Sequence, residues 1–241
     1  MAGAEPSARR RVLVVGAAQG IGRATAEGFA TAGHHVTATW NRAEPADRGA
    51  LAWRRCDITD RASVDAVFDE ARQADAPFEV VVANAAVVHD RMAARMTDDD
   101  FAAVVDVNLT GTFRVARAAL ADMAGARWGR LVLVSSVGGW YGNAGQSNYS
   151  ASKMGLLGMA RSLAREVGPR GVTVNVVSPG PVDTELIAGM NAKMIERWLR
   201  LVPAQRMGRP AEIASAIGFL ASEGAGFITG TMVPVDGGFL A

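Results

Sequence analysis

The chain has 241 residues, 49% of them hydrophobic, and its 25 basic and 24 acidic residues give a formal charge of +1. This length supports one well-buried core, and the near-neutral balance provides no global field that would attract nucleic acid or an anionic membrane. No apolar run approaches the roughly 20 residues of a membrane span, and the first residues lack the apolar stretch of a secretory signal, so we expect a cytoplasmic protein. A single cysteine and three histidines argue against a disulfide framework and a zinc site.

Apolar runs bounded by turn residues recur along the chain, and several contain Val and Leu without polar alternation. Such runs are typical of strands buried on both faces. Helical patterns lie between them, and this alternation predicts a single-domain Rossmann-type α/β fold, a doubly wound parallel sheet of about seven strands with helices on both faces. The expected strands are 11–16, 35–40, 79–83, 130–135, 172–178 and 231–235, and the expected helices are 20–32, 62–74, 98–122, 148–168 and 210–222.

Residues 1–10 are rich in Ala, Gly, Pro and Ser and are expected to form a flexible N-terminal tail, followed by one domain over 11–241. Directly after the first strand, Gly16, Gly20 and Gly22 have the spacing G-x-x-x-G-x-G, and a helix should begin near Ile21. Glycines at this place let a pyrophosphate approach backbone N–H groups at a helix N-terminus. Any tight strand-to-helix turn can also use glycine, so the functional interpretation depends on the placement of this turn in the fold.

The end of the second strand indicates the type of dinucleotide. An acidic residue there would bind the ribose of NAD, whereas a basic residue accommodates the phosphate of NADP. No Asp or Glu lies between Glu27 and Glu44, and the strand is followed by Asn41 and Arg42. NADPH is therefore favoured over NADH, although Arg42 could instead be an ordinary solvated loop residue.

Only two of the basic residues are lysines, and Lys153 stands four positions after Tyr149, one of only two tyrosines. Residues four apart share one face of a helix, so the ammonium group can lie near the phenol. A nearby cation favours the phenolate, which allows general acid/base chemistry near neutral pH. The alternative is an exposed helix with an amphipathic tyrosine and a solvated lysine.

Together with Asn84-Ala85-Ala86, Asn108 and Ser136, these motifs resemble the short-chain dehydrogenase/reductase family from about residue 11 to the C-terminus. Within the family the chain is most similar to β-ketoacyl-acyl-carrier-protein reductases, notably in GQSNYSASK and in the closing ITGTMVPVDGGF. The resemblance implies a homotetramer that reduces a β-ketoacyl thioester with NADPH, in fatty-acid or polyketide synthesis.

The resemblance also implies a role for each catalytic residue. Tyr149 would protonate the carbonyl oxygen, and Lys153 would lower the pKa of the phenol and hold the nicotinamide ribose. Ser136, rather than its neighbour Ser135, would orient the carbonyl. Asn108 would hold a water that links Lys153 to solvent, but an Asn within a helix could also merely distort it.

The cofactor contacts implied by similarity extend along most of the chain. Asp57 could equally cap the helix that follows it. The expected cofactor-binding residues are Gly16, Gln19, Gly20, Ile21, Gly22, Asn41, Arg42, Asp57, Ile58, Asn84, Ala85, Tyr149, Lys153, Pro179, Gly180, Val182 and Thr184.

Three positions depart from the family pattern. Val15 replaces a threonine, which should remove one hydrogen bond near the cofactor, worth about 1 kcal/mol. Ala86 replaces a glycine and would be strained if its φ were positive. Gln19 stands where NADPH-dependent carrier-protein reductases often have arginine.

The segment 185–202 is expected to close over the substrate, because it carries Leu186, Ile187, Met190, Met194, Trp198 and Leu199 on one expected helix; simple packing on the core is the alternative. Arg127 and Arg170 match positions that offer positive charge to an acidic carrier protein, or they are solvated arginines. Trp140 and Tyr141 could line the substrate pocket. Two other functions stay open: a dehydrogenase or reductase of a small free alcohol or ketone, and a non-catalytic dinucleotide sensor.

Overall fold

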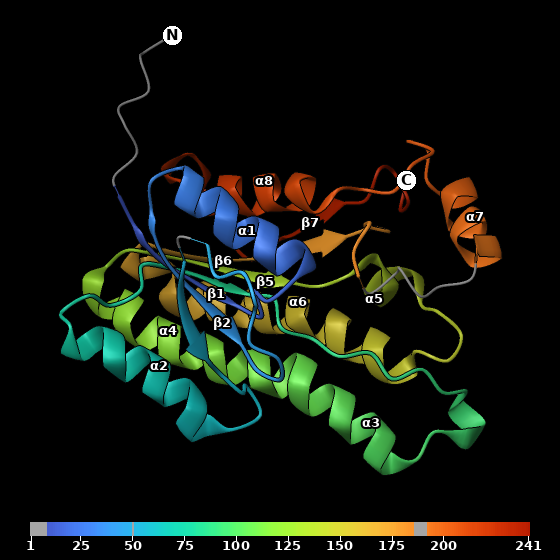
Figure 1. Cartoon of the computed structure of the whole chain (residues 1–241), viewed down its shortest axis with the longest axis horizontal. Coiled ribbons are helices and arrows are strands. Elements are labelled where there is room, and N and C mark those ends of the chain that lie inside the picture. The colour runs from blue at the N-terminus through green and yellow to red at the C-terminus, as the bar shows by residue number, and fades with distance from the viewer. Residues whose placement is uncertain (1–8, 50, 186–191) are drawn as a thin grey trace, which may run out of the picture.

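The computed structural model describes residues 9–49, 51–185 and 192–241. Seven strands form one parallel sheet in the order β3-β2-β1-β4-β5-β6-β7, which confirms the predicted doubly wound sheet (Figure 1). β1 and β4 are paired neighbours, but the chain continues from β1 to β2 on one side and from β4 to β5 on the other, so their carboxyl ends form a topological switch point. The strands are β1 (Arg11–Val15), β2 (His35–Trp40), β3 (Ala52–Arg55), β4 (Val80–Ala83), β5 (Gly129–Val134), β6 (Val172–Pro179) and β7 (Met232–Val235).

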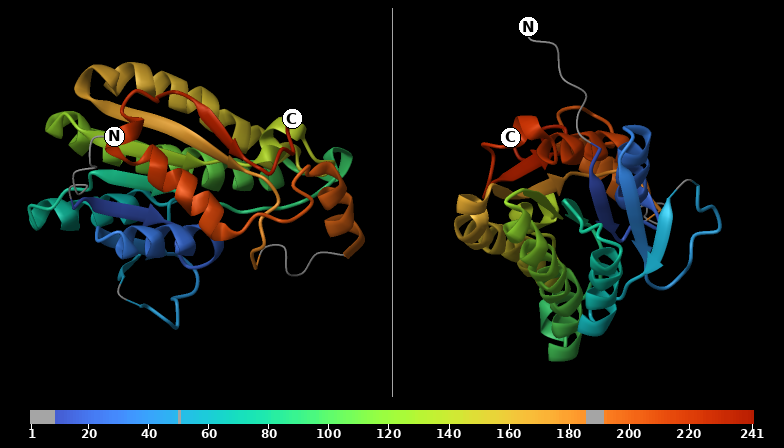
Figure 2. Two further views of the ribbon diagram at one scale, coloured as in Figure 1. Left: turned by 90° about the horizontal axis from the view of Figure 1, so that it is seen from above. Right: turned by 90° about the vertical axis from the view of Figure 1, so that its left-hand side faces the viewer.

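Helices cover both faces of the sheet (Figures 1 and 2). Within β1, Val12 and Val14 pack on the face covered by α1 and α8, whereas Leu13 and Val15 pack on the face covered by α2, α4 and α6. Both faces are buried, which explains why central strands such as β1 and β4 contain apolar runs without alternation. The helices are α1 (Gly20–Thr31), α2 (Arg61–Gln73), α3 (Asp98–Val105), α4 (Thr112–Ala126), α5 (Val137–Tyr141), α6 (Ser147–Val167), α7 (Ala192–Leu201) and α8 (Pro210–Leu220), with short 3₁₀ turns at Ala93–Arg95, Gly168–Arg170 and Glu223–Ala225.

The helix expected over 98–122 is interrupted. A π-turn at Asp106–Gly111 separates α3 from α4, so the prediction of one continuous helix was wrong. The Thr112 hydroxyl donates to the main-chain carbonyl of Asn108 at 2.9 Å, and the Asn108 side chain turns to the backbone of Val87. The Thr112 bond pairs a carbonyl that a regular helix would pair with a backbone N–H, and the Asn108 bonds tie the turn to the loop after β4, so both stabilise the distortion.

Two predicted segments lie partly outside the described residues. Residues 1–8 of the expected tail are outside, while Arg10 is held by Glu79 at 2.7 Å and by Glu223 at 2.5 Å. Residues 186–191 of the expected substrate-closing segment are also outside, including Leu186, Ile187 and Met190. No helix in the described ranges is long and apolar enough to cross a membrane.

Candidate active site

A groove of about 1060 Å³ opens at the switch point between β1 and β4. It runs from the glycine turn after β1, past the ends of β2 and β3, to Tyr149 and Lys153 on α6. The structure therefore brings together residues far apart in sequence. Of the expected cofactor residues, the groove is lined by Gly16, Gln19, Gly20, Ile21, Asn41, Arg42, Asp57, Ile58, Asn84, Ala85, Tyr149, Lys153 and Thr184.

The glycine turn packs too closely for side chains. Gly16 has φ +80°, and a Cβ there would lie 2.6 Å from the Cα of Ala85. A Cβ on Gly22 would lie 2.1 Å from the carbonyl oxygen of Gly16 and 2.6 Å from Nδ2 of Asn84. Asn84 donates from this Nδ2 to the Gly16 carbonyl at 2.7 Å and so fixes the turn. Gly22 therefore shapes the turn without lining the groove, and the exposed backbone at the start of α1 fits a dinucleotide pyrophosphate.

The two departures beside this turn have limited consequences in the structure. Val15 is 2% exposed within the sheet. A hydroxyl nevertheless lies next to the turn, because Gly16 N–H donates to Oγ1 of Thr39 at 3.1 Å. Ala86 does not have a positive φ, so its methyl group causes no left-handed strain. Sequence reasoning missed Thr39, a buried polar residue near the end of β2.

The far end of the groove carries positive charge. Arg42 and Arg55 both line it, and Arg55 donates from Nε to the carbonyl of Asn41 at 3.3 Å. The Asp57 carboxylate accepts from Thr59 N–H at 2.9 Å and from the Thr59 hydroxyl at 2.7 Å, and these bonds are the main cause that lowers the pKa of Asp57. The cap of α2 is Asp60, which accepts from Ala62 N–H. Asp57 thus stabilises a turn at the groove and does not cap that helix.

Lys153 lies at the inner end of the groove, 2% exposed. Its Nζ donates to the carbonyl of Val134 at 2.8 Å and lies 5.8 Å from the ring centroid of Tyr149. Burial lowers the pKa of Lys153 from 10.5 to about 8. Burial is also the main cause that raises the pKa of Tyr149, while its hydrogen bond with Ser136 lowers this pKa and the charge of Asp90 raises it further. The hydrogen bond with Ser136 thus lowers the pKa of the phenol, and the expected lowering by Lys153 stays a prediction.

The two consecutive serines do different things. Ser136 is half-buried, and its Oγ accepts from Gly138 N–H at 3.1 Å at the start of α5. Its neighbour Ser135 is 4% exposed and donates to the main-chain carbonyl of Lys153 at 2.8 Å. Ser135 therefore ties β5 to α6, and Ser136 is the serine that interacts with the phenol.

Asn108 lies in the π-turn and is completely buried. Its Oδ1 accepts from Val87 N–H at 2.8 Å, and its Nδ2 donates to the Val87 carbonyl at 2.9 Å and to Oγ of Ser152 at 3.2 Å. Ser152 in turn donates to the Tyr149 carbonyl at 2.7 Å. Asn108 thereby links the loop after β4 to the turn of α6 that bears Tyr149. Its expected water relay remains a prediction.

A second cavity, of about 330 Å³, adjoins the groove, and Tyr149 lines both. Ser136 lies in its wall, whereas Trp140 is not part of the lining. The expected cofactor residues Pro179, Gly180 and Val182 line this second cavity and do not line the groove. Apolar and aromatic side chains line much of the wall, and the described part of the expected closing segment contributes Trp198. The other aromatic and apolar residues include Tyr141, Phe239, Ile21, Val88 and Val137.

A series of hydrogen bonds between polar side chains, which sequence reasoning missed, lies in the wall of this second cavity. Asn143 donates from Nδ2 to Oε1 of Gln146 at 3.0 Å, and Gln146 donates from Nε2 to Asp90. A Cβ built on Gly138 would lie 3.4 Å from Nδ2 of Asn143, 3.4 Å from Oγ of Ser136 and 3.6 Å from the Tyr149 ring. This series of hydrogen bonds therefore ends beside Ser136 and Tyr149, the expected catalytic residues.

Arg127 and Arg170 lie at the other edge of the sheet. They precede the amino ends of β5 and β6, whereas Ser136 and Pro179 lie at the carboxyl ends. Arg127 adopts φ +56° at the end of α4, and one of its terminal nitrogens lies 3.5 Å from the Pro169 carbonyl oxygen. The structure does not bring these arginines to the second cavity of the same chain.

Comparisons with known proteins agree with this geometry. A family model described as "Enoyl-(Acyl carrier protein) reductase" matches residues 16–240. The 3-oxoacyl-[acyl-carrier-protein] reductase MabA of Mycobacterium tuberculosis is 44% identical over 233 residues, covering 97% of this chain and 94% of the relative. The 3-oxoacyl-[acyl-carrier-protein] reductase FabG of Escherichia coli is 40% identical over 232 residues, covering 94% of this chain and 95% of the relative. The sequence match over nearly the whole chain confirms the predicted resemblance: the protein belongs to the short-chain dehydrogenase/reductase family of oxidoreductases.

Proposed function

We propose that the protein reduces the keto group of a β-ketoacyl thioester carried by acyl carrier protein, and that it uses NADPH. The observation that carries this proposal is the position of Tyr149 and Ser136 where the dinucleotide-sized groove meets the second cavity. The relatives named above act, by their names, on 3-oxoacyl groups of acyl carrier protein.

The chemistry needs a proton and two electrons at one carbonyl group. A bound nicotinamide would supply the hydride. Ser136 and Tyr149 present hydroxyl groups on one wall, where they can donate hydrogen bonds to the carbonyl oxygen as negative charge develops on it. Tyr149 gives up its proton as the general acid, and its raised pKa keeps the phenol protonated at neutral pH.

Lys153 has two roles in this proposal. Its ammonium group is buried under the groove and offers donors to the sugar hydroxyls of the cofactor. Positive charge on it also stabilises the phenolate that remains after proton transfer. Because its pKa is about 8, a modest change in surroundings is enough to move the lysine between its charged and neutral forms.

The preference for NADPH is proposed from Arg42 and Arg55, two guanidinium groups at the far end of the groove. Arginine matches phosphate geometry with paired N–H donors. Replacing Arg42 with Gln should raise the KM for NADPH at least several-fold and leave the KM for NADH nearly unchanged. The matched control is Arg61→Gln, an exposed arginine on α2 paired with Asp65. Equal rises in the KM for NADPH and for NADH would contradict the assignment of Arg42 as a residue that binds the phosphate of NADPH.

The proposed assembly is a homotetramer. Large apolar side chains that remain exposed in the single chain, Phe101 on α3, Phe113 on α4 and Phe219 on α8, support burial between subunits. Docking of the carrier protein on Arg127 and Arg170 would then serve the site of another subunit, because these arginines lie away from their own substrate cavity. Light scattering on the purified protein measures the assembly directly.

The deciding experiment follows NADPH oxidation by the purified protein with three substrates: a β-ketoacyl carrier protein, a simple β-ketoacyl thioester and a small free ketone. The proposal expects the highest kcat/KM with the carrier-bound substrate, and a loss of about 100-fold or more in Tyr149→Phe. Preference for the free ketone would favour the alternative of a small-molecule reductase. Tight NADPH binding with no turnover of any substrate would favour the sensor.

A further inference from the structure

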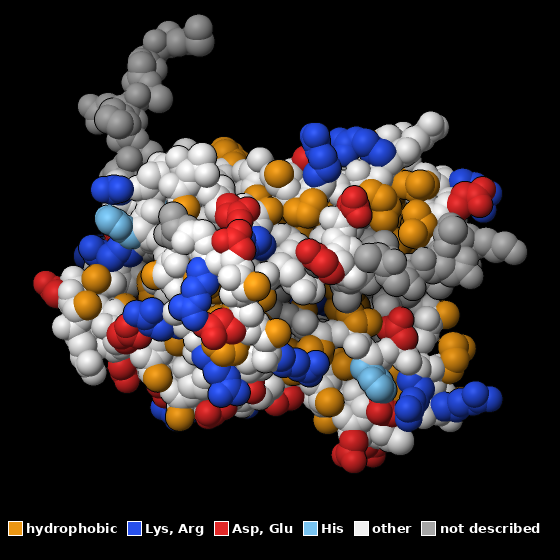
Figure 3. All heavy atoms as spheres, in the orientation of Figure 1, with side chains coloured by type: hydrophobic (Ala, Val, Ile, Leu, Met, Phe, Trp, Pro, Cys, Tyr) orange, Lys and Arg blue, Asp and Glu red, His pale blue; other side chains and the backbone are white. Residues whose placement is uncertain are grey.

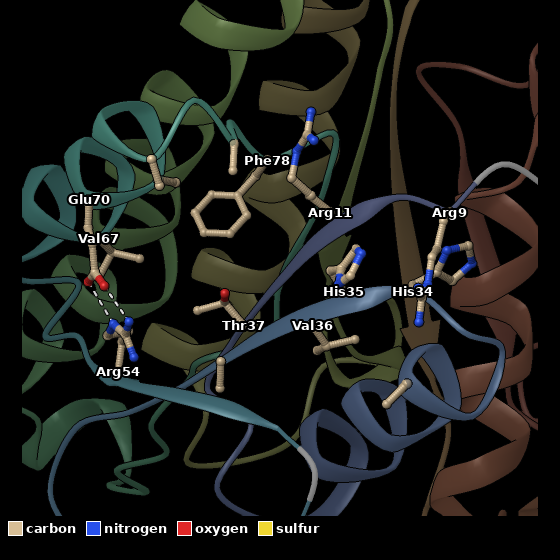
Figure 4. A pocket seen from close by; sticks show the side chains of 15 residues that line it. Arg9, Arg11, His34, His35, Val36, Thr37, Arg54, Val67, Glu70 and Phe78 are labelled. Atoms are coloured by element: carbon tan, nitrogen blue, oxygen red, sulfur yellow. Dashed lines mark hydrogen bonds and ion pairs between the residues drawn. The ribbon is translucent and has the colours of Figure 1, made fainter.

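A separate cavity of about 730 Å³ lies at the opposite edge of the sheet from the active site (Figure 4). It is framed by the amino-terminal parts of β1 and β2, by β3 and by the last turns of α2. Its volume falls within the range of small-molecule sites, roughly 300–1,000 Å³. Neither the proposed reaction nor the proposed cofactor uses any residue that lines it.

The floor of this amino-edge cavity is apolar. Phe78 and Val67 are each 6% exposed, and the Phe78 ring packs edge-on against Phe68 with centroids 5.5 Å apart. Where α2 crosses the sheet edge, the lining side chains are small, so they do not fill the space between helix and sheet. These are Ala52, Ala71, Ala74 and Ala76.

Two guanidinium groups are held in place on the rim. Arg9 donates from Nε to the Gly33 carbonyl at 2.6 Å, and Arg11 donates from Nε to the Pro77 carbonyl at 3.0 Å. Within the described ranges, the terminal nitrogens of both side chains have no hydrogen-bond partner. An arginine anchored through Nε presents its two terminal nitrogens as a fixed fork, which matches a carboxylate or phosphate.

The acidic groups nearby are already paired. Among the described residues, Glu70 is the one carboxylate that lines the cavity, and it binds Arg54, with 2.6 Å between Arg54 Nε and a carboxylate oxygen. Glu79, which lies 3.9 Å from Nε of Arg11, is bound to Arg10 at 2.7 Å and accepts from Arg11 N–H at 3.0 Å. The rim therefore keeps an excess of positive charge, and basic and histidine side chains gather at the left-hand end of the surface in Figure 3.

Histidine adds a further donor. His34 accepts on Nδ1 from Arg10 N–H at 3.1 Å, so in its neutral form the proton is on Nε2. Burial and the charge of Arg10 lower the pKa of His34, which keeps the ring neutral near pH 7. Figure 4 shows His34 beside Arg9 at one end of the cavity, with Phe78 and the Thr37 hydroxyl toward its middle.

We propose that this amino-edge cavity binds a small organic anion, with its carboxylate or phosphate on the fork of Arg11, its apolar body against Phe78, and Arg9 adding positive charge at the other end of the cavity (Figure 4). The ligand needs both an anionic group and an apolar body, because the charged side chains lie on the rim and the floor is apolar. β1 has five residues, and at about 3.3 Å per residue the bound anion would lie about 15 Å or more from the catalytic groove. The site is therefore independent of the proposed reductase function.

The test is calorimetric titration of the full chain with four probes: phenyl phosphate, phenylacetate, inorganic phosphate and benzyl alcohol. Phenyl phosphate or phenylacetate should bind at least tenfold more tightly than the other two. Comparing the affinities of phenyl phosphate and phenylacetate distinguishes a phosphate ligand from a carboxylate ligand. Equal binding of inorganic phosphate and phenyl phosphate would overturn the role of the apolar floor, and the proposal with it.

Two variants locate the site. Arg9→Gln/Arg11→Gln should weaken binding at least tenfold, and Ala71→Leu, which fills the floor, should weaken it through a different contact. Arg42→Gln is the matched control, because it changes the phosphate end of the catalytic groove and should leave probe binding unchanged. Binding that survives both rim and floor variants, or that Arg42→Gln abolishes, would show that the probes bind elsewhere.

Discussion

Gln146 donates from its amide nitrogen to both carboxylate oxygens of Asp90, at 2.9 and 3.1 Å. The carboxylate is thereby fixed in the wall of the cavity that also contains Tyr149. The nearby basic groups of the same loop, His89 and Arg91, pair with Asp100 at 3.2 and 2.8 Å. Asp90 consequently acts on the phenol as a negative charge that its neighbours do not neutralise.

We expect Asp90→Asn to move the pH profile of reduction. The charge of Asp90 raises the pKa of Tyr149, so its removal lowers that pKa. Since Tyr149 must be protonated to act as the acid, activity should be lost at a lower pH on the alkaline side. Profiles of kcat/KM for wild type and variant measure this. Asp99→Asn, in the exposed first turn of α3, is the control, and an unchanged alkaline limb in Asp90→Asn would refute the electrostatic role.

Lys153→Met should change how stability depends on pH in the cofactor-free protein. The folded state has a pKa of about 8 and the reference value is 10.5, so between these values the unfolded chain binds more protons. The wild-type free energy of unfolding should therefore rise across this window, relative to the variant. The difference corresponds to about 3 kcal/mol at most. Denaturant unfolding of both proteins from pH 7 to 10.5 measures it, and parallel curves would contradict the prediction.

Ser136→Ala and Ser135→Ala should separate catalysis from packing. Ser136→Ala removes a donor from the reacting oxygen and the cap of α5, and we expect a fall in kcat of about 100-fold with a loss of stability of about 1 kcal/mol. Ser135→Ala removes the bond to the Lys153 carbonyl and should lower stability by about 1 kcal/mol with a smaller effect on kcat. Steady-state kinetics measures the change in kcat for both variants, and thermal unfolding measures the change in stability. The assignment fails if the Ser135 variant is the less active one.

Gly22→Ala should disrupt the nucleotide turn, because its Cβ would lie 2.1 Å from the Gly16 carbonyl oxygen. We expect cofactor binding to weaken more than tenfold, as measured by fluorescence titration. Gly28→Ala in the same helix is the matched control, since nothing lies within 4 Å of its Cβ, and it should stabilise the helix by up to about 1 kcal/mol. Equal behaviour of the two variants would show that the turn tolerates the methyl group.

Six of the seven strands were predictable from sequence, and in strands such as β1 and β4 the reason is that burial on both faces leaves continuous apolar runs. β3 was not among these runs: Ala52 and Arg55 are exposed on this edge strand, and its pattern AWRR gives no apolar run. The π-turn was also hidden, because it depends on bonds between Asn108, Thr112 and Val87, and Val87 comes from a distant loop.

The residues of the candidate site were also only partly predictable from sequence. Local motifs identified Tyr149, Lys153 and the glycine turn, since their chemistry depends on short spacing along the chain. Thr39 and Asp90 were missed because each acts through a partner brought near by the sheet or by a loop. The amino-edge cavity left no motif, since its cations and its floor come from four separate elements.

The π-turn also determines where the chain tolerates a change of length. A π-turn accommodates one residue more than the regular helical path, and each residue rotates a helix by about 100°. Deleting one residue within 106–111 would therefore allow a regular helix to run from α3 into α4, so that Val115, Ala119 and Met123 would keep their places in the core. The same deletion would displace Asn108 from the backbone of Val87, so length variation in this segment is limited by the Asn108 contacts rather than by the packing of α4.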